Sequence, residues 1–425
     1  MKIPKEKILS YVALAGQRYW PKKPPFDVCV SGQFDIARLG LEWCWIKLPP
    51  EHSSLGVEGQ LFVDRAAISP GDGPEWQRCD WPIACFSYLC CQGERHHEQK
   101  HGPVHSYAGR LKNVPQACFD YAWVNRIFLL LRLLAANDNS IEQFGPLPNA
   151  EIQLTYDVDA LDKTWAIRFK QAIFEAVNCI RDQNRMGSLR RLWRMASLTP
   201  NYFYLQESLD KAIESNLAPI YFLHARKPIR PLFLHLMDPA YHLSDLRLLS
   251  FFREGERTNT IFGLHPSFAD WNDPQVLLEG RETLKGVLGT SPTHVRQHWL
   301  RFSFGATWHA QQKAGFEMDM TLGFNDRSGF RAGAALMFHP WSTDWMAPFK
   351  LKTLPLVFMD SHVYSYRALN ACARRKAIDF IVDEVKKVRG QASVLWHPHT
   401  FAEDYDWSEG HSHLIKRIAE TNLNR

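Results

Sequence analysis

The sequence has no apolar run long enough to cross a bilayer and no cysteine pair at metal-binding spacing. The run at 127–131 is interrupted by Arg132 and falls far short of the roughly 20 residues that a spanning helix needs. Nine cysteines are present, but none forms a Cys-x-x-Cys pair, and Cys90 and Cys91 are adjacent. This usage is typical of reduced thiols in the cytoplasm, and it gives no support to a zinc site built from cysteines.

A large excess of one charge is also absent. The chain has 50 Lys+Arg against 45 Asp+Glu, a formal net charge of +5. The basic cluster RRLWR at 190–194 is short and interleaved with apolar residues, which indicates a solvated helix face rather than a nucleic-acid patch. No apolar segment with a small-residue cleavage signal follows Met1, so we expect a cytoplasmic protein rather than one secreted by a signal peptide.

The length of the chain and the change in its residue pattern predict two domains. At 425 residues it exceeds one typical domain, and we expect an accessory α/β domain over 1–148 and a larger domain over 149–425. A segment rich in Pro, Gly and Asn at 145–149 indicates the linker between the two domains. Apolar spacing predicts a helix at 124–136, whereas the histidine-rich stretch 93–105 lacks such periodicity, which favours an exposed loop over a metal site.

Beyond the linker, short apolar runs alternate with helical stretches. The pattern predicts strands at 151–156, 218–223, 259–264, 294–299, 354–359 and 393–396. It predicts helices at 164–185, 274–288, 307–314, 368–389, with Gly390 as the C′ glycine, and 413–420. This alternation indicates an α/β fold, which we expect to be a distorted (β/α) barrel of mainly parallel strands.

Ionisable side chains follow several of these predicted strands. Asp157 and Asp159 come after the first strand, His265 after the third, Asp360 after the fifth and His397 after the last. The active sites of parallel α/β folds are built at the carboxyl ends of the strands. We therefore expect these side chains to converge in space although they are far apart in the sequence.

The Asp-x-Asp pair suits metal-assisted hydrolysis. In an extended segment both carboxylates lie on one side, since side chains alternate with a period of two. One can bind a divalent cation while the other accepts a proton from water activated by the metal, and an opposing imidazole can protonate a leaving amine. Asp-x-Asp alone is also common in turns and surface pairs, so the interpretation depends on the strand-end histidines.

Several short segments resemble the motifs of the polysaccharide deacetylases, carbohydrate esterase family 4. TYDVD at 155–159 resembles the first motif, which implies Asp157 as the general base and Asp159 as a metal ligand. GLHPS at 263–267 resembles the second, which implies His265 as a ligand. RQH at 296–298 is similar in position to the third, and SVLWH at 393–397 resembles the last, which implies His397 as the catalytic histidine.

The order and spacing of these segments resemble a branch of the family associated with bacterial cell-surface polysaccharides. Segments expected in that branch are present as DMTLGF at 319–324, GFRAG at 329–333 and PLVFMD at 355–360. The resemblance covers about residues 150 to 420. It implies a divalent metal, for which zinc suits a site of carboxylate and imidazole ligands, and a carbohydrate partner.

One departure concerns the metal. The second motif of the family has two histidines four residues apart, but Ala269 occupies the second position here. His298 is the nearest replacement and would complete an Asp-His-His site with open positions for water and substrate. Packing of His298 against Trp299 is an equally good interpretation.

Other residues allow both a functional and a structural role. We expect Arg296, Arg331 and Asp360 in substrate binding; Arg296 could instead orient Asp157, Arg331 could form a salt bridge, and Asp360 could cap a helix. His399 is the alternative to His397 as the catalytic histidine. Four tryptophans could stack on sugar rings, although most tryptophans belong to the core: Trp308, Trp341, Trp345 and Trp407.

The sequence thus predicts a metal-dependent enzyme that removes acetyl groups from N-acetylated sugars of a surface polysaccharide or its precursor. The main alternative is a degenerate relative that binds glycan or a biosynthetic partner without turnover, which the missing histidine at position 269 keeps open. A phosphoesterase would need further metal ligands or cationic phosphate contacts that the sequence does not reveal.

Overall fold

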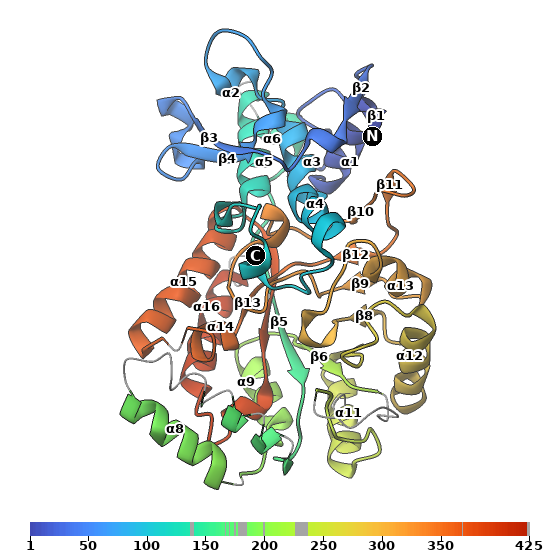
Figure 1. Ribbon diagram of the computed structural model, residues 1–425, viewed down its shortest axis with the longest axis vertical. Helices are drawn as coiled ribbons and strands as arrows, with labels where there is room; N and C mark the ends of the chain where they lie inside the picture. Colours follow the sequence, from blue (N-terminus) through green and yellow to red (C-terminus); the bar gives the residue numbers. More distant parts are fainter. Residues whose placement is uncertain are drawn as a thin grey trace.

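The computed structural model describes residues 1–136, 140–165, 167–169, 171–173, 176, 185–198, 200–225, 237–367 and 369–422. Its centre is an eight-stranded sheet in which every neighbouring pair is parallel (Figure 1). In spatial order the strands are β12 (Lys352–Thr353), β9 (Met318–Asp319), β8 (His294–Val295), β7 (Ile261–Leu264), β6 (Ile220–Leu223), β5 (Glu151–Val158), β14 (Gln391–Trp396) and β13 (Leu356–Met359).

The sheet curls into a distorted barrel, as the sequence predicts. Its edge strands β12 and β13 do not pair with each other. Backbone that follows β9 bridges the gap, because the Leu356 amide donates to the Leu322 carbonyl at 2.9 Å and the Gly329 amide donates to the Val357 carbonyl at 3.0 Å. The strands are short and apolar, as expected where helices cover a parallel sheet.

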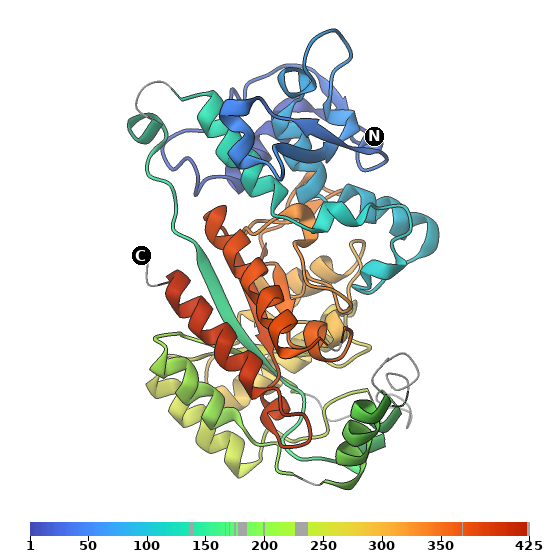
Figure 2. The ribbon, with the colours of Figure 1, turned by 90° about the vertical axis from the view of Figure 1, so that its left-hand side faces the viewer.

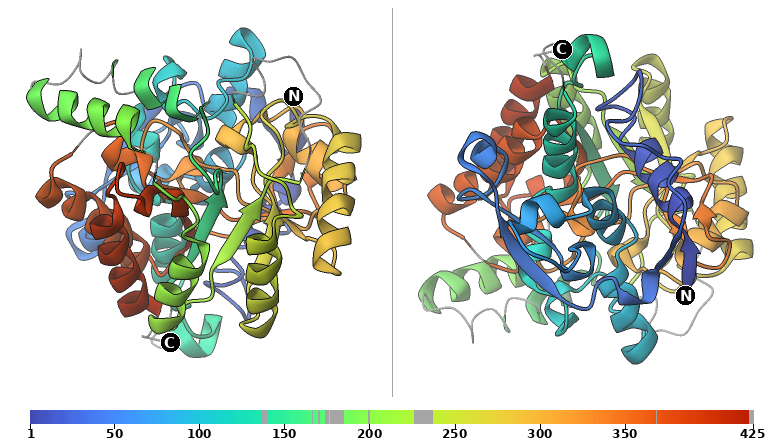
Figure 3. Two further views of the ribbon diagram at one scale, coloured as in Figure 1. Left: turned by 90° about the horizontal axis from the view of Figure 1, so that it is seen from below. Right: turned by 90° about the horizontal axis from the view of Figure 1, so that it is seen from above.

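Helices surround the strands (Figure 3). Along the chain they are α8 (Arg185–Ser197), α9 (Leu205–Glu214), α11 (Leu246–Arg257), α12 (Pro274–Leu288), α13 (Thr307–Lys313), α14 (Ser361–Tyr364), α15 (Ala371–Lys387) and α16 (Ser408–Asn422). Figure 2 shows α15 and α16 side by side along β5. Local chemistry sets several boundaries: Asp273 accepts hydrogen bonds from the Gln275 and Val276 amides, and Pro274 opens α12.

Residues before the barrel lie at the end where the strands begin (Figure 1). Arg18 donates to the Asn149 carbonyl ahead of β5, and the Tyr19 hydroxyl donates to the Val388 carbonyl ahead of β14. The region contains β1 (Lys2–Pro4), α1 (Lys5–Ala15), β2 (Gln33–Asp35), β3 (Trp43–Lys47), β4 (Gln60–Asp64), α2 (Glu75–Arg78), α3 (Trp81–Leu89), α4 (Gln92–His101), α5 (Trp123–Leu134) and α6 (Ser140–Phe144). Its apolar residues share one buried cluster with those of the barrel. The boundary at 148 stays a prediction.

The histidine-rich stretch 93–105 differs from its prediction as a loop. Most of it belongs to α4, in which Glu94 and Arg95 are buried. Arg95 donates to the carbonyls of Cys90 and Trp341, both at 2.8 Å. Polar contacts rather than apolar side chains hold this helix against the barrel, so apolar periodicity could not reveal it.

Two other boundaries also differ. The strand predicted at 294–299 is only β8, because Trp299 and Leu300 take left-handed backbone angles with φ of 57° and 45°. At the end of α15 the left-handed residue is Arg389, with φ of 55°, rather than Gly390. The helix predicted at 164–185 lies partly outside the described residues; residues 165, 167–169 and 171–173 are helical. Among the described residues, no helix combines the length and apolar character needed to cross a bilayer.

Candidate metal centre and active site

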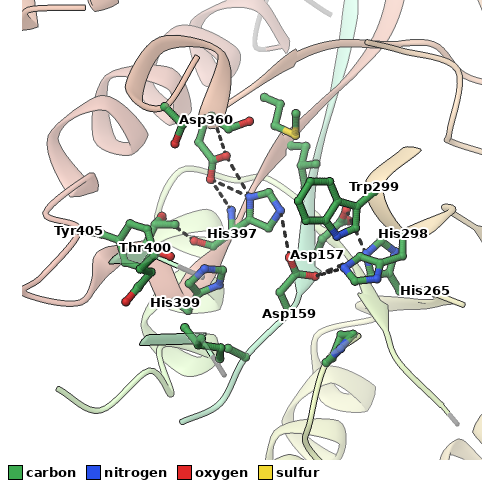
Figure 4. Close-up of a pocket in the computed structure, with 18 of the residues that line it drawn as sticks. Asp157, Asp159, His265, His298, Trp299, Asp360, His397, His399, Thr400 and Tyr405 are labelled. Atoms are coloured by element: carbon green, nitrogen blue, oxygen red, sulfur yellow. Dashed lines mark hydrogen bonds and ion pairs between the residues drawn. The ribbon is translucent and has the colours of Figure 1, made fainter. Parts of the chain in front are cut away.

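A cavity of about 230 Å³ opens at the carboxyl ends of the strands. Six of the eight predicted site residues line it: Asp157, Asp159, His265, His298, Asp360 and His397 (Figure 4). The parallel sheet brings them together, since they come from the ends of β5, β7, β8, β13 and β14 or from the residues that follow. Among the described residues, none before Asp157 lines the cavity.

Asp157, the predicted base, is held from one side. The Arg296 guanidinium is fully buried and donates Nη1–H to Asp157 Oδ1 at 3.0 Å and to Thr155 Oγ1 at 2.6 Å. Asp157 Oδ2 lies 3.7 Å from His265 Nε2. Arg296 does not line the cavity, so its position matches orientation of Asp157 rather than contact with substrate.

Asp159 faces two imidazoles. Its Oδ1 lies 3.5 Å from His265 Nε2 and 3.7 Å from His298 Nε2 (Figure 4). These distances are longer than good hydrogen bonds, and Asp159 Oδ1 is buried without a hydrogen-bond partner. Burial opposes ionisation of Asp159, but the nearby histidines hold its pKa well below the usual range.

The other nitrogen of each imidazole is already engaged. His265 Nδ1 lies 2.7 Å from the Arg296 carbonyl, and His298 Nδ1 lies 3.4 Å from Asp238 Oδ1. A neutral imidazole that donates from Nδ1 presents the lone pair of Nε2, which is the form that binds a metal. In that form, both Nε2 atoms would present a lone pair toward a cation beside the Asp159 carboxylate.

These three residues fit a divalent cation. Their ligand atoms lie within 4.8 Å of one another. Ligands about 2.1 Å from a zinc ion at tetrahedral angles lie roughly 3.4 Å apart, close to the separations between Asp159 and the two histidines. Asp159 Oδ1, which has no hydrogen-bond donor, also indicates a cation site. A buried carboxylate oxygen without a donor is costly unless a positive charge faces it.

His397 lies on the opposite side of Asp159. Its Nε2 is 3.6 Å from Asp159 Oδ2, while its Nδ1 lies 2.9 Å from Asp360 Oδ1. The His397 amide also donates to Asp360 Oδ2 at 2.8 Å. Burial alone would lower the pKa of His397, but Asp360, with Asp159 and Asp157 further away, raises it to about 9. The imidazole is thus protonated at neutral pH and carries a proton toward the cavity.

Asp360 has a structural part as well. It is fully buried, and its Oδ1 accepts from the Ser361 amide at the start of α14. Asp360 thus lines the cavity and also caps a helix, the two roles that the sequence left open. Toward the cavity its carboxylate contacts His397 and orients that imidazole.

Arg331 is not brought to the site. It is fully buried, pairs with Glu94 at 2.8 Å and donates to Ser106 Oγ at 2.7 Å and to the Gly323 carbonyl at 3.0 Å. Arg331 therefore forms the buried salt bridge that the sequence allowed as its structural role. Of the four tryptophans only Trp407 lines the cavity. His399 also lines it.

Asp238 is the residue that the sequence did not suggest. Besides facing His298, its Oδ1 accepts from the Phe268 amide at 2.6 Å. No predicted strand ends before it, and residues 226–236 lie outside the described part of the chain. Only its place beside Pro239, a turn signal, marks the segment as a loop.

Comparison with protein-family models and with curated proteins gives no match. Among solved structures, the chain is similar to one from Mycobacterium smegmatis assigned as a polysaccharide deacetylase, at 17% identity and a TM-score of 0.38, over 64% of this chain and 84% of that one. It is similar to a family 4 carbohydrate esterase from Streptomyces lividans at 11% identity and a TM-score of 0.30, over 65% and 90%. A third is the PuuE allantoinase, at 10% identity and a TM-score of 0.38, over 68% and 92%.

The first two names belong to the family that the sequence motifs resemble. At these identities and TM-scores the likeness carries no argument about chemistry.

Proposed function

We propose that this chain is a metal-dependent hydrolase that removes acetyl groups from N-acetylated sugars of a surface polysaccharide or its precursor. The observation that supports it most is the grouping of four functions in one cavity. A base, a set of cation ligands, an acid and residues that orient them lie within hydrogen-bond or ion-pair reach of one another. A protein that only binds glycan has no need of this combination.

Asp159, His265 and His298 would hold the cation, with zinc the ion that suits these donors best. When bound, the cation supplies polarisation of the amide carbonyl and lowers the pKa of water toward neutrality.

Asp157 acts as the general base. Arg296 holds one of its oxygens, which leaves Oδ2 on the side of His265 and the cavity. From there Oδ2 can accept the proton of the water that attacks the acetyl carbonyl. The buried guanidinium keeps the carboxylate in one orientation and balances its charge.

His397 acts as the general acid. Asp360 fixes its Nδ1, so Nε2 carries the proton that faces the cavity. Breaking the C–N bond produces an amine that must leave with a proton, and the imidazolium can donate it. Trp299, Tyr405 and Trp407 line the same cavity, and their rings suit stacking against a sugar.

Acetate release from N-acetylated oligosaccharides tests this proposal. The zinc-loaded protein is expected to release acetate, and Asp157→Asn and His397→Ala are each expected to lower kcat/KM by about 100-fold or more while the bound metal is retained. His399→Ala is the matched control for the second variant, because it removes a neighbouring imidazole of the same cavity and should leave most of the activity.

Two results would contradict the proposal. One is acetate release that Asp157→Asn does not reduce. The other is a zinc-loaded chain that binds these sugars and releases no acetate, which would support the degenerate glycan-binding relative instead.

A further inference from the structure

Two turns with left-handed backbone angles meet beside the cavity. In the first, Trp299 and Leu300 have φ of 57° and 45°, and in the second, His105 and Ser106 have φ of 47° and 65°. Such angles are uncommon for residues other than glycine and persist only where the surrounding structure holds them. The first turn directly follows His298 and brings the Trp299 ring to the cavity (Figure 4). The contacts that hold these turns therefore also shape the cavity.

Ser106 supports the first turn from the N-terminal region. Its side chain is fully buried, and its hydroxyl donates to the Leu300 carbonyl at 2.6 Å and accepts from Arg331 Nη1 at 2.7 Å. A guanidinium can only donate hydrogen bonds, so the single hydroxyl proton is directed at Leu300. The buried pair of Arg331 with Glu94 thus acts on the cavity indirectly, through Ser106.

Asn325 joins the two turns. Its Nδ2 donates to the Trp299 carbonyl at 2.8 Å and to the His105 carbonyl at 3.3 Å. Its backbone amide donates to the Ser106 carbonyl at 2.8 Å. Both partners of the side chain are carbonyl oxygens, which only accept hydrogen bonds, so the amide nitrogen must face them. The two turns therefore fix the orientation of the Asn325 side chain.

The other end of this amide, Oδ1, is left for the cavity. Asn325 lines the cavity and is 4% exposed. Among the described residues none donates to Asn325 Oδ1, yet this oxygen is not closed off from solvent as Asp159 Oδ1 is. An acceptor held in one place favours a ligand that brings a donor to it, and a ligand without that donor leaves the acceptor unpaired.

We infer that Asn325 determines the specificity of the site. Its Oδ1 accepts a hydrogen bond from a ring hydroxyl of the sugar, while the Trp299 ring packs against an apolar face of the same sugar. The acetamido N–H belongs to the reacting group, which lies between Asp157 and His397 in the proposed reaction, so a ring hydroxyl is the donor left for Asn325. Ser106 is a positioning residue, because it reaches the cavity only through the first turn.

This inference rests on the proposed function in one respect, namely that the ligand is an N-acetylated sugar. Equilibrium binding of deoxy sugars tests it in the zinc-loaded Asp157→Asn background, which should bind a sugar without turnover. Calorimetry compares trisaccharides of N-acetylglucosamine and of N-acetylgalactosamine with analogues that lack one free hydroxyl group of the middle residue. We expect at least one analogue to bind about tenfold more weakly than its parent, or weaker still.

Asn325→Ala is expected to remove this discrimination. Without Oδ1 the parent sugar and the same analogue should bind within about twofold of each other, whereas a loss of structure alone would weaken both by the same factor and keep their ratio. Ser106→Ala is the matched control, because it removes the support of Leu300 and leaves Asn325 Oδ1 in place. In the control the ratio should stay as in the background.

A second variant guards against misfolding. If Asn325→Ala does not fold, as judged by circular dichroism, Asn325→Ser takes its place, since its shorter side chain can donate to a carbonyl of the turns but does not reach the position of Oδ1. The inference is overturned if no deoxy analogue binds more weakly than its parent, or if the variant at position 325 keeps the discrimination of the background.

Acetate release separates this inference from the proposed function. Acetate release by the wild type, with discrimination unchanged in Asn325→Ala, would contradict the inference alone. Discrimination that depends on Asn325 in a chain that releases no acetate would contradict the proposed reaction alone. A chain that neither binds these sugars nor releases acetate would contradict both.

Discussion

Each histidine of the site owes its orientation to a partner that the sequence does not place beside it. His265 uses the Arg296 carbonyl, His298 uses Asp238 and His397 uses Asp360. Strand-end positions predict where the histidines gather, because the carboxyl ends of parallel strands meet at one end of a sheet. The partners depend on backbone turns and on a loop, which no local pattern encodes. That is why Asp238 could not be predicted and Asp360 was expected to face substrate.

Asp238→Asn tests the orientation of His298. The amide keeps the size of the side chain but removes the charge that favours an Nδ1 proton, so Nε2 loses part of its role as a ligand. We expect zinc to bind about 10 to 100 times more weakly, measured by competition with a chromophoric chelator. Unchanged zinc affinity would show that Asp238 does not support the metal through His298.

Asp360→Asn tests the state of His397. Since Asp360 stabilises the imidazolium and the pKa of His397 is raised to about 9, the acid form dominates below that pH. Activity should therefore fall as pH rises through about 9 in the wild type. In the variant the pKa drops, and the alkaline limb of kcat/KM should move to lower pH by about one unit or more. A limb that stays in place would mean that His397 is not the acid.

At the scale of elements, buried apolar strands and capped helices were predictable, and irregular backbone was not. The helix predicted at 274–288 matches α12, because Asp273 and Pro274 are strong start signals. The end of α15 was expected to use the left-handed freedom of Gly390, but Arg389 adopts that conformation. Gly390 has another reason to be glycine: a Cβ there would lie 2.7 Å from the Ala335 Cβ and 2.8 Å from its carbonyl oxygen.

Gly390→Ala should consequently destabilise the fold by about 1–3 kcal/mol, because backbone must shift to admit the methyl group. Gly286→Ala is the matched control, since that glycine lies in α12 with no atom within 4 Å of an added Cβ. The control should be neutral or stabilising by up to about 1 kcal/mol. Chemical denaturation measures both, and equal effects in the two variants would rule out the contact with Ala335.

At the scale of the whole molecule, charged pairs buried between distant segments join the N-terminal region to the barrel. Arg126 on α5 and Glu384 on α15 form one such pair, with Nε–Oε1 at 2.8 Å and both side chains buried. Arg331 and Glu94 form another. Partners 237 and 258 positions apart in the chain cannot be matched from local sequence, so Arg331 looked equally suited to a substrate.

Glu384→Gln should cost about 3–5 kcal/mol in the free energy of unfolding, because it leaves the Arg126 charge buried without its partner. Glu409→Gln breaks an exposed pair with Arg375 and should cost less than about 1 kcal/mol. A loss for Glu384→Gln no larger than that of the exposed control would show that the pair does not hold the two regions together.

The central claim, a cation held by Asp159, His265 and His298, is tested most directly by the zinc content of the purified protein after loading and removal of free metal. We predict about one equivalent per chain in the wild type and almost none in His298→Ala, with the fold intact by circular dichroism. A wild-type chain that retains no zinc or other divalent ion, or a His298→Ala variant that retains as much as the wild type, would contradict the account.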